Sequence, residues 1–281
     1  MDYIYHLITF IALYTILSQS LTLFSGYTNL LSLAHAGFYG IGAYTSALLS
    51  VHYGIPIVLN FIAAIAFSSI IAFVISFIAL RTYEDYFVIV TLGIQIVIYS
   101  LMNNLMDITN GPLGIVGIPS ITYFDNNLSF MILAMVIAGT IYYLLNNFSK
   151  SSYALNLKGI KDDEIFMLSL GKNVKKIKVT VFTLSAALAS IAGVLYAHYI
   201  SYIDPTSFTI EESIFILSIM IIGYNTFHGA FLASIFMILL PELLRFIGLP
   251  DSIGANLRQI IYGVILVALV IFQEKHKQKT V

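Results

Sequence analysis

Few side chains in this 281-residue sequence have the types and spacing that catalysis requires. Histidines stand in apolar stretches at His35, His198 and His228, and an ionisable residue at membrane depth suggests a function. The alternative is a neutral hydrogen bond that holds helices together, and we favour it for His35. No serine lies in a G-x-S-x-G pattern, and no H-E-x-x-H pattern or carboxylate pair suggests hydrolysis. We expect a protein that is not an enzyme, with a membrane-embedded hydrolase using a serine and His35 as an alternative.

An energy source for transport is also missing from the chain. The phosphate-binding pattern G-x-x-x-x-G-K-[ST] is absent, which predicts no ATP site of its own. The apolar segments hold no Asp or Glu near their middles, where a proton- or sodium-coupled carrier usually needs one. We interpret the chain as a pathway-forming component that is driven from outside itself. An ATPase-independent secondary transporter of a small polar solute is the alternative.

The composition is that of a membrane protein. Hydrophobic residues make up 59% and charged residues 10% of the chain, whereas soluble domains carry about 25% charged residues. The mean hydropathy is +0.93. The net charge of −1 gives no nucleic-acid footprint, and the absence of cysteine excludes disulfides and cysteine-ligated metals.

Apolar segments cover most of the sequence. Nine can be drawn, at about 6–24, 33–51, 56–80, 86–106, 128–146, 179–200, 210–224, 229–245 and 257–273. They predict an all-α polytopic membrane protein with about 8–10 transmembrane helices. We expect residues 1–281 to form a single transmembrane domain, interrupted by a polar loop at about 147–178.

Basic residues predict how the chain is oriented in the lipid bilayer. The stretch 150–178 carries seven lysines and the C-terminal tail three more, so we expect both, and hence the C-terminus, to be cytoplasmic. The other side is assigned acidic residues and no lysine: Asp2, Asp107, Asp125, Asp204, Glu211, Glu212 and Asp251.

The polar stretch 150–178 contains a candidate helix from about 161 to 170. Acidic residues fall in its first turn, where they suit the positive end of the helix dipole, and Gly171 follows as a stop. The residues considered for this element are Lys161, Asp162, Asp163, Glu164, Phe166, Leu170 and Gly171. The bulky apolar residues of 165–170 do not fall on one face. Both a connector lying on lipid headgroups and a docking helix for a soluble subunit are therefore open.

Three further stretches have distinct compositions. Small residues at Ser32, Ala36 and Gly40 allow close helix packing and predict a central second helix. Glycines and prolines make 107–119 an ordered external loop, and the break at 223–229 a candidate for the pathway or its cytoplasmic gate. Candidate pathway residues are polar groups in apolar or broken segments, with interhelical hydrogen bonding as their alternative role: Ser32, His35, Thr91, Gln95, Asn103 and Asn225.

Several stretches, in this order, resemble a known family. They are 26–45 (GYTNLLSLAHAGFYGIGAYT), 85–93 (DYFVIVTLG), 109–114 (TNGPLG) and 178–196 (KVTVFTLSAALASIAGVLY), followed by Pro205 and Gly223. Together they are similar to branched-chain amino-acid ABC transporter permeases of the LivM type. The chain departs from the family at 29–32, at Gln95, where a glutamate is common, and at Tyr224, which leaves the substrate open.

The resemblance implies the architecture and the partners. It implies an importer-type helical bundle in a prokaryotic inner or plasma membrane, forming half of the pathway beside a second, related permease. Two ABC ATPase subunits would bind the ATP, and an extracytoplasmic solute-binding protein would deliver a branched-chain or other small amino acid. It also implies that the segment from Lys161 to Gly171 couples the permease to the ATPases.

Overall fold

A computed structural model describes residues 2–82, 84–121, 124, 126–245 and 263–264. Eight of the nine apolar segments coincide with helices, and the ninth lies outside the described residues apart from 263–264. The helices are α1 (Asp2–Leu21, continued by the π-helix η1, Thr22–Gly26), α2 (His35–Tyr53), α3 (Ile57–Ala79), α4 (Glu84–Asn104), α6 (Asn127–Phe148), α9 (Val174–Ile200), α10 (Ile210–Ile222) and α11 (Phe227–Arg245).

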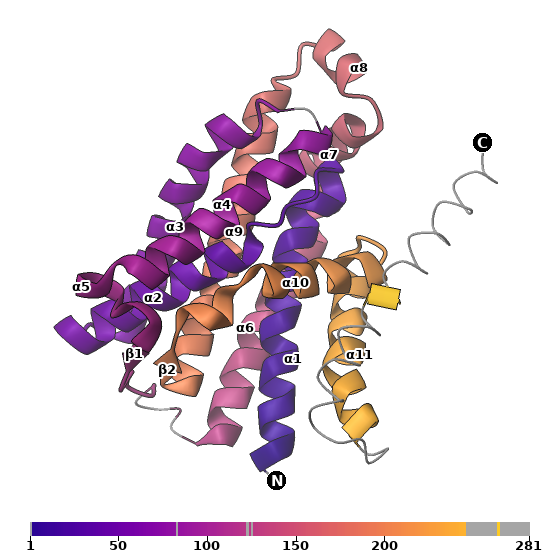
Figure 1. The fold of residues 1–281 in the computed structure, drawn as a ribbon. Helices are drawn as coiled ribbons and strands as arrows, with labels where there is room; N and C mark the ends of the chain where they lie inside the picture. Colours follow the sequence, from indigo (N-terminus) through magenta and orange to yellow (C-terminus); the bar gives the residue numbers. More distant parts are fainter. Residues whose placement is uncertain (1, 83, 122–123, 125, 246–262, 265–281) are drawn as a thin grey trace.

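The shorter elements connect these helices. They are α5 (Met106–Thr109), the 3-10 helix η2 (Gly111–Leu113), β1 (Ile115–Val116), α7 (Ser152–Asp162), α8 (Glu164–Ser169), β2 (Tyr202–Ile203) and the 3-10 helix η3 (Pro205–Phe208). Figure 1 shows a bundle in which α10 lies across the middle and α8 projects from one end.

Six helical segments in the described residues are long and apolar enough to cross a membrane. They are Asp2–Gly26, Ile57–Ala79, Tyr86–Asn104, Asn127–Phe148, Val174–Ile200 and Pro205–Ile222, with Phe227–Glu242 as a shorter apolar helix. The protein is therefore an all-α polytopic membrane protein. The helix α2 is not among the six, although it has 19 residues, and its many glycines, serines and histidines lower its hydropathy.

The central position predicted for the second helix is confirmed. Most of α2 is buried, and its neighbours are α9, α3, α10 and α4. The closest backbone approach is not at Ser32, Ala36 and Gly40, as the spacing suggested, but where α2 crosses α9. A Cβ on Gly42 would collide with the backbone of Ser190, and a Cβ on Gly193 would collide with the backbone of Tyr39 and Ala43. Glycine is needed here because two helix backbones touch.

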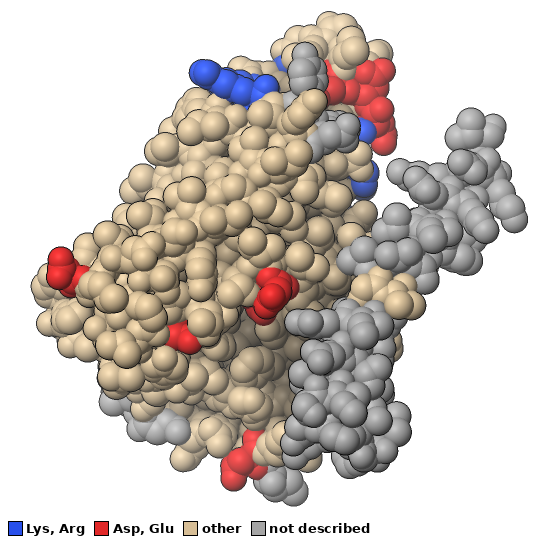
Figure 2. Space-filling view, viewed as in Figure 1, with Lys and Arg blue, Asp and Glu red and all other residues tan. Residues whose placement is uncertain are grey.

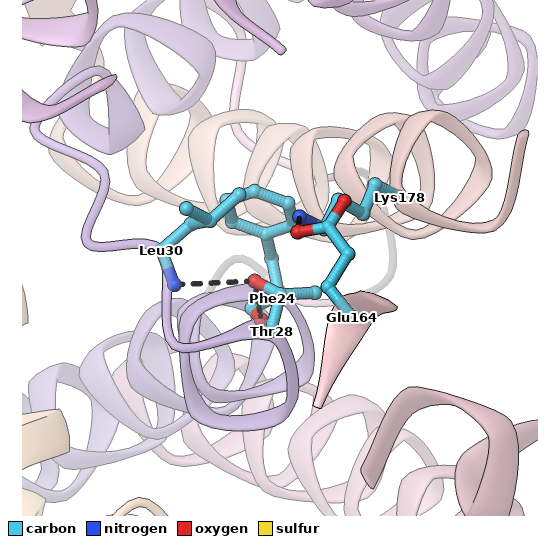
Figure 3. Close-up of polar contacts among 5 residues, drawn as sticks. All are labelled: Phe24, Thr28, Leu30, Glu164 and Lys178. Carbon is cyan, nitrogen blue, oxygen red and sulfur yellow. Dashed lines mark hydrogen bonds and ion pairs between the residues drawn. The ribbon is translucent and has the colours of Figure 1, made fainter. Parts of the chain in front are cut away.

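The chain between α1 and α2 is irregular and, apart from Asn29 and Leu31, buried. The last turn of α1 widens into the π-helix η1, a feature that often marks functional sites. Beyond it, Thr28 donates from Oγ1 to the carbonyl of Phe24 at 2.8 Å and accepts from the amide of Leu30 at 3.4 Å, as Figure 3 shows. Such hydrogen bonds allow backbone outside a regular helix to stay buried within a membrane protein.

The loop predicted at 107–119 is ordered and belongs to a larger contact. Its strand β1 pairs antiparallel with β2, with Ile115 opposite Ile203. His198 lies beside it: Nδ1 contacts the carbonyl of Pro119 at 2.7 Å and Nε2 contacts Oγ of Ser46 at 2.7 Å. His198 therefore joins α9, α2 and this loop, which fits the structural alternative.

Candidate coupling surface and polar cluster

The polar stretch folds into two short helices, so the single helix expected from 161 to 170 is wrong. Lys161 and Asp162 end α7, and Asp163 has an extended backbone (φ −155°, ψ 101°). Its Oδ1 accepts a hydrogen bond of 2.9 Å from the amide of Phe166. Aspartate favours this N-cap geometry over a helix interior, which explains why the helix breaks here and α8 begins at Glu164.

The predicted stop at Gly171 is confirmed. Gly171 has φ +74°, and its amide donates to the carbonyl of Leu168 at 2.9 Å. The amide of Lys172 donates to the carbonyl of Met167 at 3.2 Å. These two bonds form a Schellman motif, in which a left-handed residue after the helix is normally glycine.

The helix α8 presents an apolar surface to its surroundings. Ile165 is 80% exposed, Phe166 57% and Leu170 56%, and Leu168 is also exposed. Met167 faces the other way and packs with Ile160 and Val174. A group of large exposed apolar side chains on a projecting helix marks an interaction site.

Two polar contacts fasten this pair of helices to the bundle. Glu164 and Lys178 form an ion pair of 2.7 Å (Figure 3), in which the lysine side chain is only 10% exposed. Lys161 donates from Nζ to the carbonyl of Gly26 at 2.8 Å. The first contact ties α8 to the start of α9, and the second ties the end of α7 to the end of η1.

Basic residues gather at the same end of the molecule. On the face that Figure 2 shows, the blue side chains lie at the end that carries α7 and α8, while acidic ones also occur elsewhere. This asymmetry agrees with the pattern of lysines in the sequence.

Four of the six candidate pathway residues meet around the start of α2. Thr91 accepts from the amide of Leu33 at 3.1 Å, and Ser32 accepts from the amide of Ala34 at 3.4 Å. Gln95 accepts from the amide of Gly37 at 2.6 Å and donates to the carbonyl of Phe208 at 2.7 Å. His35 shares a hydrogen bond of 2.6 Å, through Nε2, with Oγ of Ser20. Side chains from other elements thus take the place of a capping residue, since the first amides of a helix have no partner within it.

The other two candidates lie apart from this cluster. Asn103 is near the end of α4, where its carbonyl lies close to Gly111. Asn225 is in the turn between α10 and α11, where it and Tyr224 have φ of 54° and 53°. The backbone and Cβ of Asn225 lie against Gly26, so this turn touches the residue that Lys161 binds.

Glu212, which the sequence places on the side opposite the lysines, is only partly exposed in the structure. It lies in the first turn of α10, inside the span Pro205–Ile222, and its Oε1 is buried with no hydrogen-bond partner among the described residues. The neighbouring Ser213 accepts from the amide of Ala36 at 3.0 Å. In the sequence, Glu212 already falls inside the apolar segment 210–224, and this position could have indicated that the glutamate lies within a helix of the bundle. In the described part of the chain, no group of His, Asp and Glu could hold a metal ion.

Comparison with known proteins agrees with this architecture. Residues 3–270 match the family described as branched-chain amino acid transport system / permease component. The chain is 32% identical over 269 residues to the high-affinity branched-chain amino acid transport system permease protein LivM of Escherichia coli, covering 84% of this chain and 62% of that protein. The Salmonella typhimurium protein of that name is 32% identical over 265 residues, with the same coverage of both chains.

A more distant relative is archaeal. The probable branched-chain amino acid transport permease protein LivM of Methanocaldococcus jannaschii is 23% identical over 282 residues, covering 86% of this chain and 81% of that protein. No solved structure matches the chain. The chain spans less than two thirds of the length of the two bacterial relatives. On the family match and the 32% identity to the bacterial relatives, the chain belongs to the branched-chain amino acid transport system permease family.

Proposed function

We propose that this chain is the membrane-spanning permease subunit of an ATP-driven ABC importer for branched-chain or other small amino acids. It forms half of the translocation pathway, as a single membrane domain. A second, related permease supplies the other half, and a solute-binding protein delivers the amino acid from outside. The family match and the names of the relatives support this proposal.

The apolar surface of α8 is the observation that carries the proposal. We assign the α7–α8 end to the cytoplasm because the basic residues gather there. An ABC ATPase subunit that covers Ile165, Phe166 and Leu170 removes their apolar area from water. ATP supplies the energy in that subunit, and none is bound by this chain.

The two links to the bundle give the docking surface a mechanical output. When the ATPase moves α7 and α8, the contacts Lys161–Gly26 and Glu164–Lys178 transmit the displacement to η1 and α9. Helix α9 borders α2, whose start carries the polar cluster, and η1 packs against α9. A difference in ATPase affinity for the outward- and inward-open states is sufficient to shift the equilibrium between them.

The test is reconstitution of this chain in proteoliposomes together with its ABC ATPase subunits, the second permease and the solute-binding protein, as encoded by the adjacent genes. We expect uptake of radiolabelled leucine that requires ATP and both ATPase subunits. A Phe166→Ser, Leu170→Ser variant should retain its fold and lose ATPase association and uptake. Leu155→Ser is the matched control, because Leu155 is 64% exposed on α7 but outside the α8 surface. Uptake that persists without any ATPase would favour the secondary transporter instead.

A further inference from the structure

The carboxylate of Glu212 is poorly compensated where it lies. Its Oε1 is buried with no hydrogen-bond partner among the described residues. The ion pair found among those residues joins Lys178 to Glu164 and does not involve Glu212. The Glu212 side chain makes a hydrogen bond with Tyr14, which partly offsets the cost of burying the carboxylate. An ionisable side chain held at membrane depth without a cation is unfavourable, and such residues mark substrate or ion pathways.

Three tyrosines lie near this carboxyl group. Tyr14 stands on α1, and its ring meets that of Phe215, on α10, edge to face at 5.1 Å. Tyr39, on α2, and Tyr196, on α9, are within electrostatic range of Glu212, and their ring centroids are 5.5 Å apart. Four helices, α1, α2, α9 and α10, therefore contribute aromatic side chains or the carboxyl group itself to the environment of Glu212, and Asp204 also lies within electrostatic range of Tyr196.

The environment is also close to the surface of the bundle. Glu212 itself is partly exposed, as are Tyr14 and Tyr196. Figure 2 shows acidic side chains in the middle of the face that α10 crosses, away from the basic end. The site lies beside the polar cluster, because Oγ of the neighbouring Ser213 accepts a hydrogen bond from the amide of Ala36 at the start of α2.

We propose that Glu212 is a substrate-binding residue that receives the α-ammonium group of an amino acid during its passage. The inference rests on the proposed function, and it names the group of that substrate which this permease binds. An ammonium group complements both missing partners at once: it donates hydrogen bonds to Oε1 and supplies the positive charge. The faces of Tyr39 and Tyr196 add cation–π attraction and an apolar wall for an aliphatic side chain.

A metal ion fits the site less well. Hard cations take six or more oxygen ligands, most of them from carboxylates and carbonyls, and among the described residues no group of three or more His, Asp and Glu side chains could hold a metal ion. One carboxylate with aromatic neighbours is suited to an organic cation instead.

The experiment compares glutamate variants in the reconstituted complex with radiolabelled leucine as the probe. Glu212→Gln keeps the shape and the bond to Tyr14 but removes the charge. We expect uptake per ATP hydrolysed to fall by about tenfold or more, as for the loss of a charged hydrogen bond, while assembly with the ATPases is unchanged. Glu212→Asp keeps the charge and should restore part of the uptake. Glu211→Gln, at the exposed neighbouring residue, should stay within about twofold of wild type.

The contradicting results are distinct from those for the proposed function. Wild-type uptake by Glu212→Gln overturns this inference and leaves the ATP-driven permease intact. Equal loss in the Gln and Asp variants also overturns it, because the charge is then irrelevant. If Glu212→Gln fails to assemble, the Asp variant decides, since loss of uptake in an assembled Asp complex overturns the inference. A wild-type complex with no ATP-dependent uptake overturns the proposed function.

Discussion

Nζ of Lys161 and the carbonyl oxygen of Gly26 lie 2.8 Å apart, although 135 residues separate them in the sequence. Lys161 stands in the last turn of α7, and Gly26 ends the π-helix η1. Asn225 lies against Gly26 from a third direction. Three parts of the chain therefore meet at Gly26: the end of α7, the end of η1 and the turn between α10 and α11.

This junction predicts a coupling defect when its lysine is replaced. Lys161→Met removes the donor to Gly26 while it keeps a side chain of similar length. We expect uptake per ATP hydrolysed to fall several-fold, with assembly unchanged, because a hydrogen bond to a charged donor contributes about 1.5–3 kcal/mol. The measurement is paired uptake and ATPase activity in proteoliposomes. Lys172→Met, at an exposed lysine, is the control, and equal defects in both variants would remove the junction from the mechanism.

The N-cap of α8 gives a second prediction. Asp163→Ala should loosen α8, because loss of an N-cap costs about 1 kcal/mol of helix stability. Asp163→Asn keeps the cap and removes the charge, so it should behave as wild type. Binding of the purified ATPase to the permease in nanodiscs measures the difference. If the Asn variant binds as weakly as the Ala variant, charge rather than the cap governs docking.

A larger residue at the crossing of α2 and α9 should lower the stability of the protein markedly. Gly42→Ala places a methyl group against the backbone of Ser190, and overpacking of this kind costs about 1–3 kcal/mol. Gly93→Ala is the control, because nothing lies within 4 Å of a Cβ at that glycine. Thermal unfolding in detergent should show a lower midpoint for the first variant and little change for the second. Equal midpoints would argue against the close crossing.

Replacement of Gln95 should lower the stability of the protein and its transport activity together. Its side chain bridges the amide of Gly37 and the carbonyl of Phe208. Gln95→Leu removes the donor to the Phe208 carbonyl, at about 1–3 kcal/mol, while the amide of Gly37 keeps its bond of 3.1 Å to the carbonyl of Ala34. We expect a lower unfolding midpoint along with reduced uptake. Unchanged stability with lost uptake would instead assign Gln95 to substrate contact.

The sequence predicted the long helices and some of the breaks between them. Long apolar runs leave a membrane chain little choice but helix, so eight predicted segments match helices in the described residues. The stop at Gly171 was also predictable, because a glycine after a helix has a specific backbone role.

Other features depended on contacts between distant parts of the chain. Asp163 was predicted inside a helix, because the charge pattern of 161–164 suits both a first turn and a cap. The widening of α1 into η1 has no sequence signal that we could identify. Thr91 and Gln95 were chosen only as polar residues in apolar segments. Their meeting at the start of α2 follows from tertiary packing, as does the burial of the Oε1 atom of Glu212.

The central claim is that an ABC ATPase subunit binds α8 on the cytoplasmic side of the membrane. The chain has no cysteine, so Phe166→Cys gives a single labelling site on an exposed position. We predict that a membrane-impermeant maleimide labels this cysteine in inside-out vesicles only, that bound ATPase protects it, and that a bifunctional maleimide links it to an ATPase subunit with an engineered surface cysteine. Labelling from outside intact cells, or full reactivity in the assembled complex, would contradict the account.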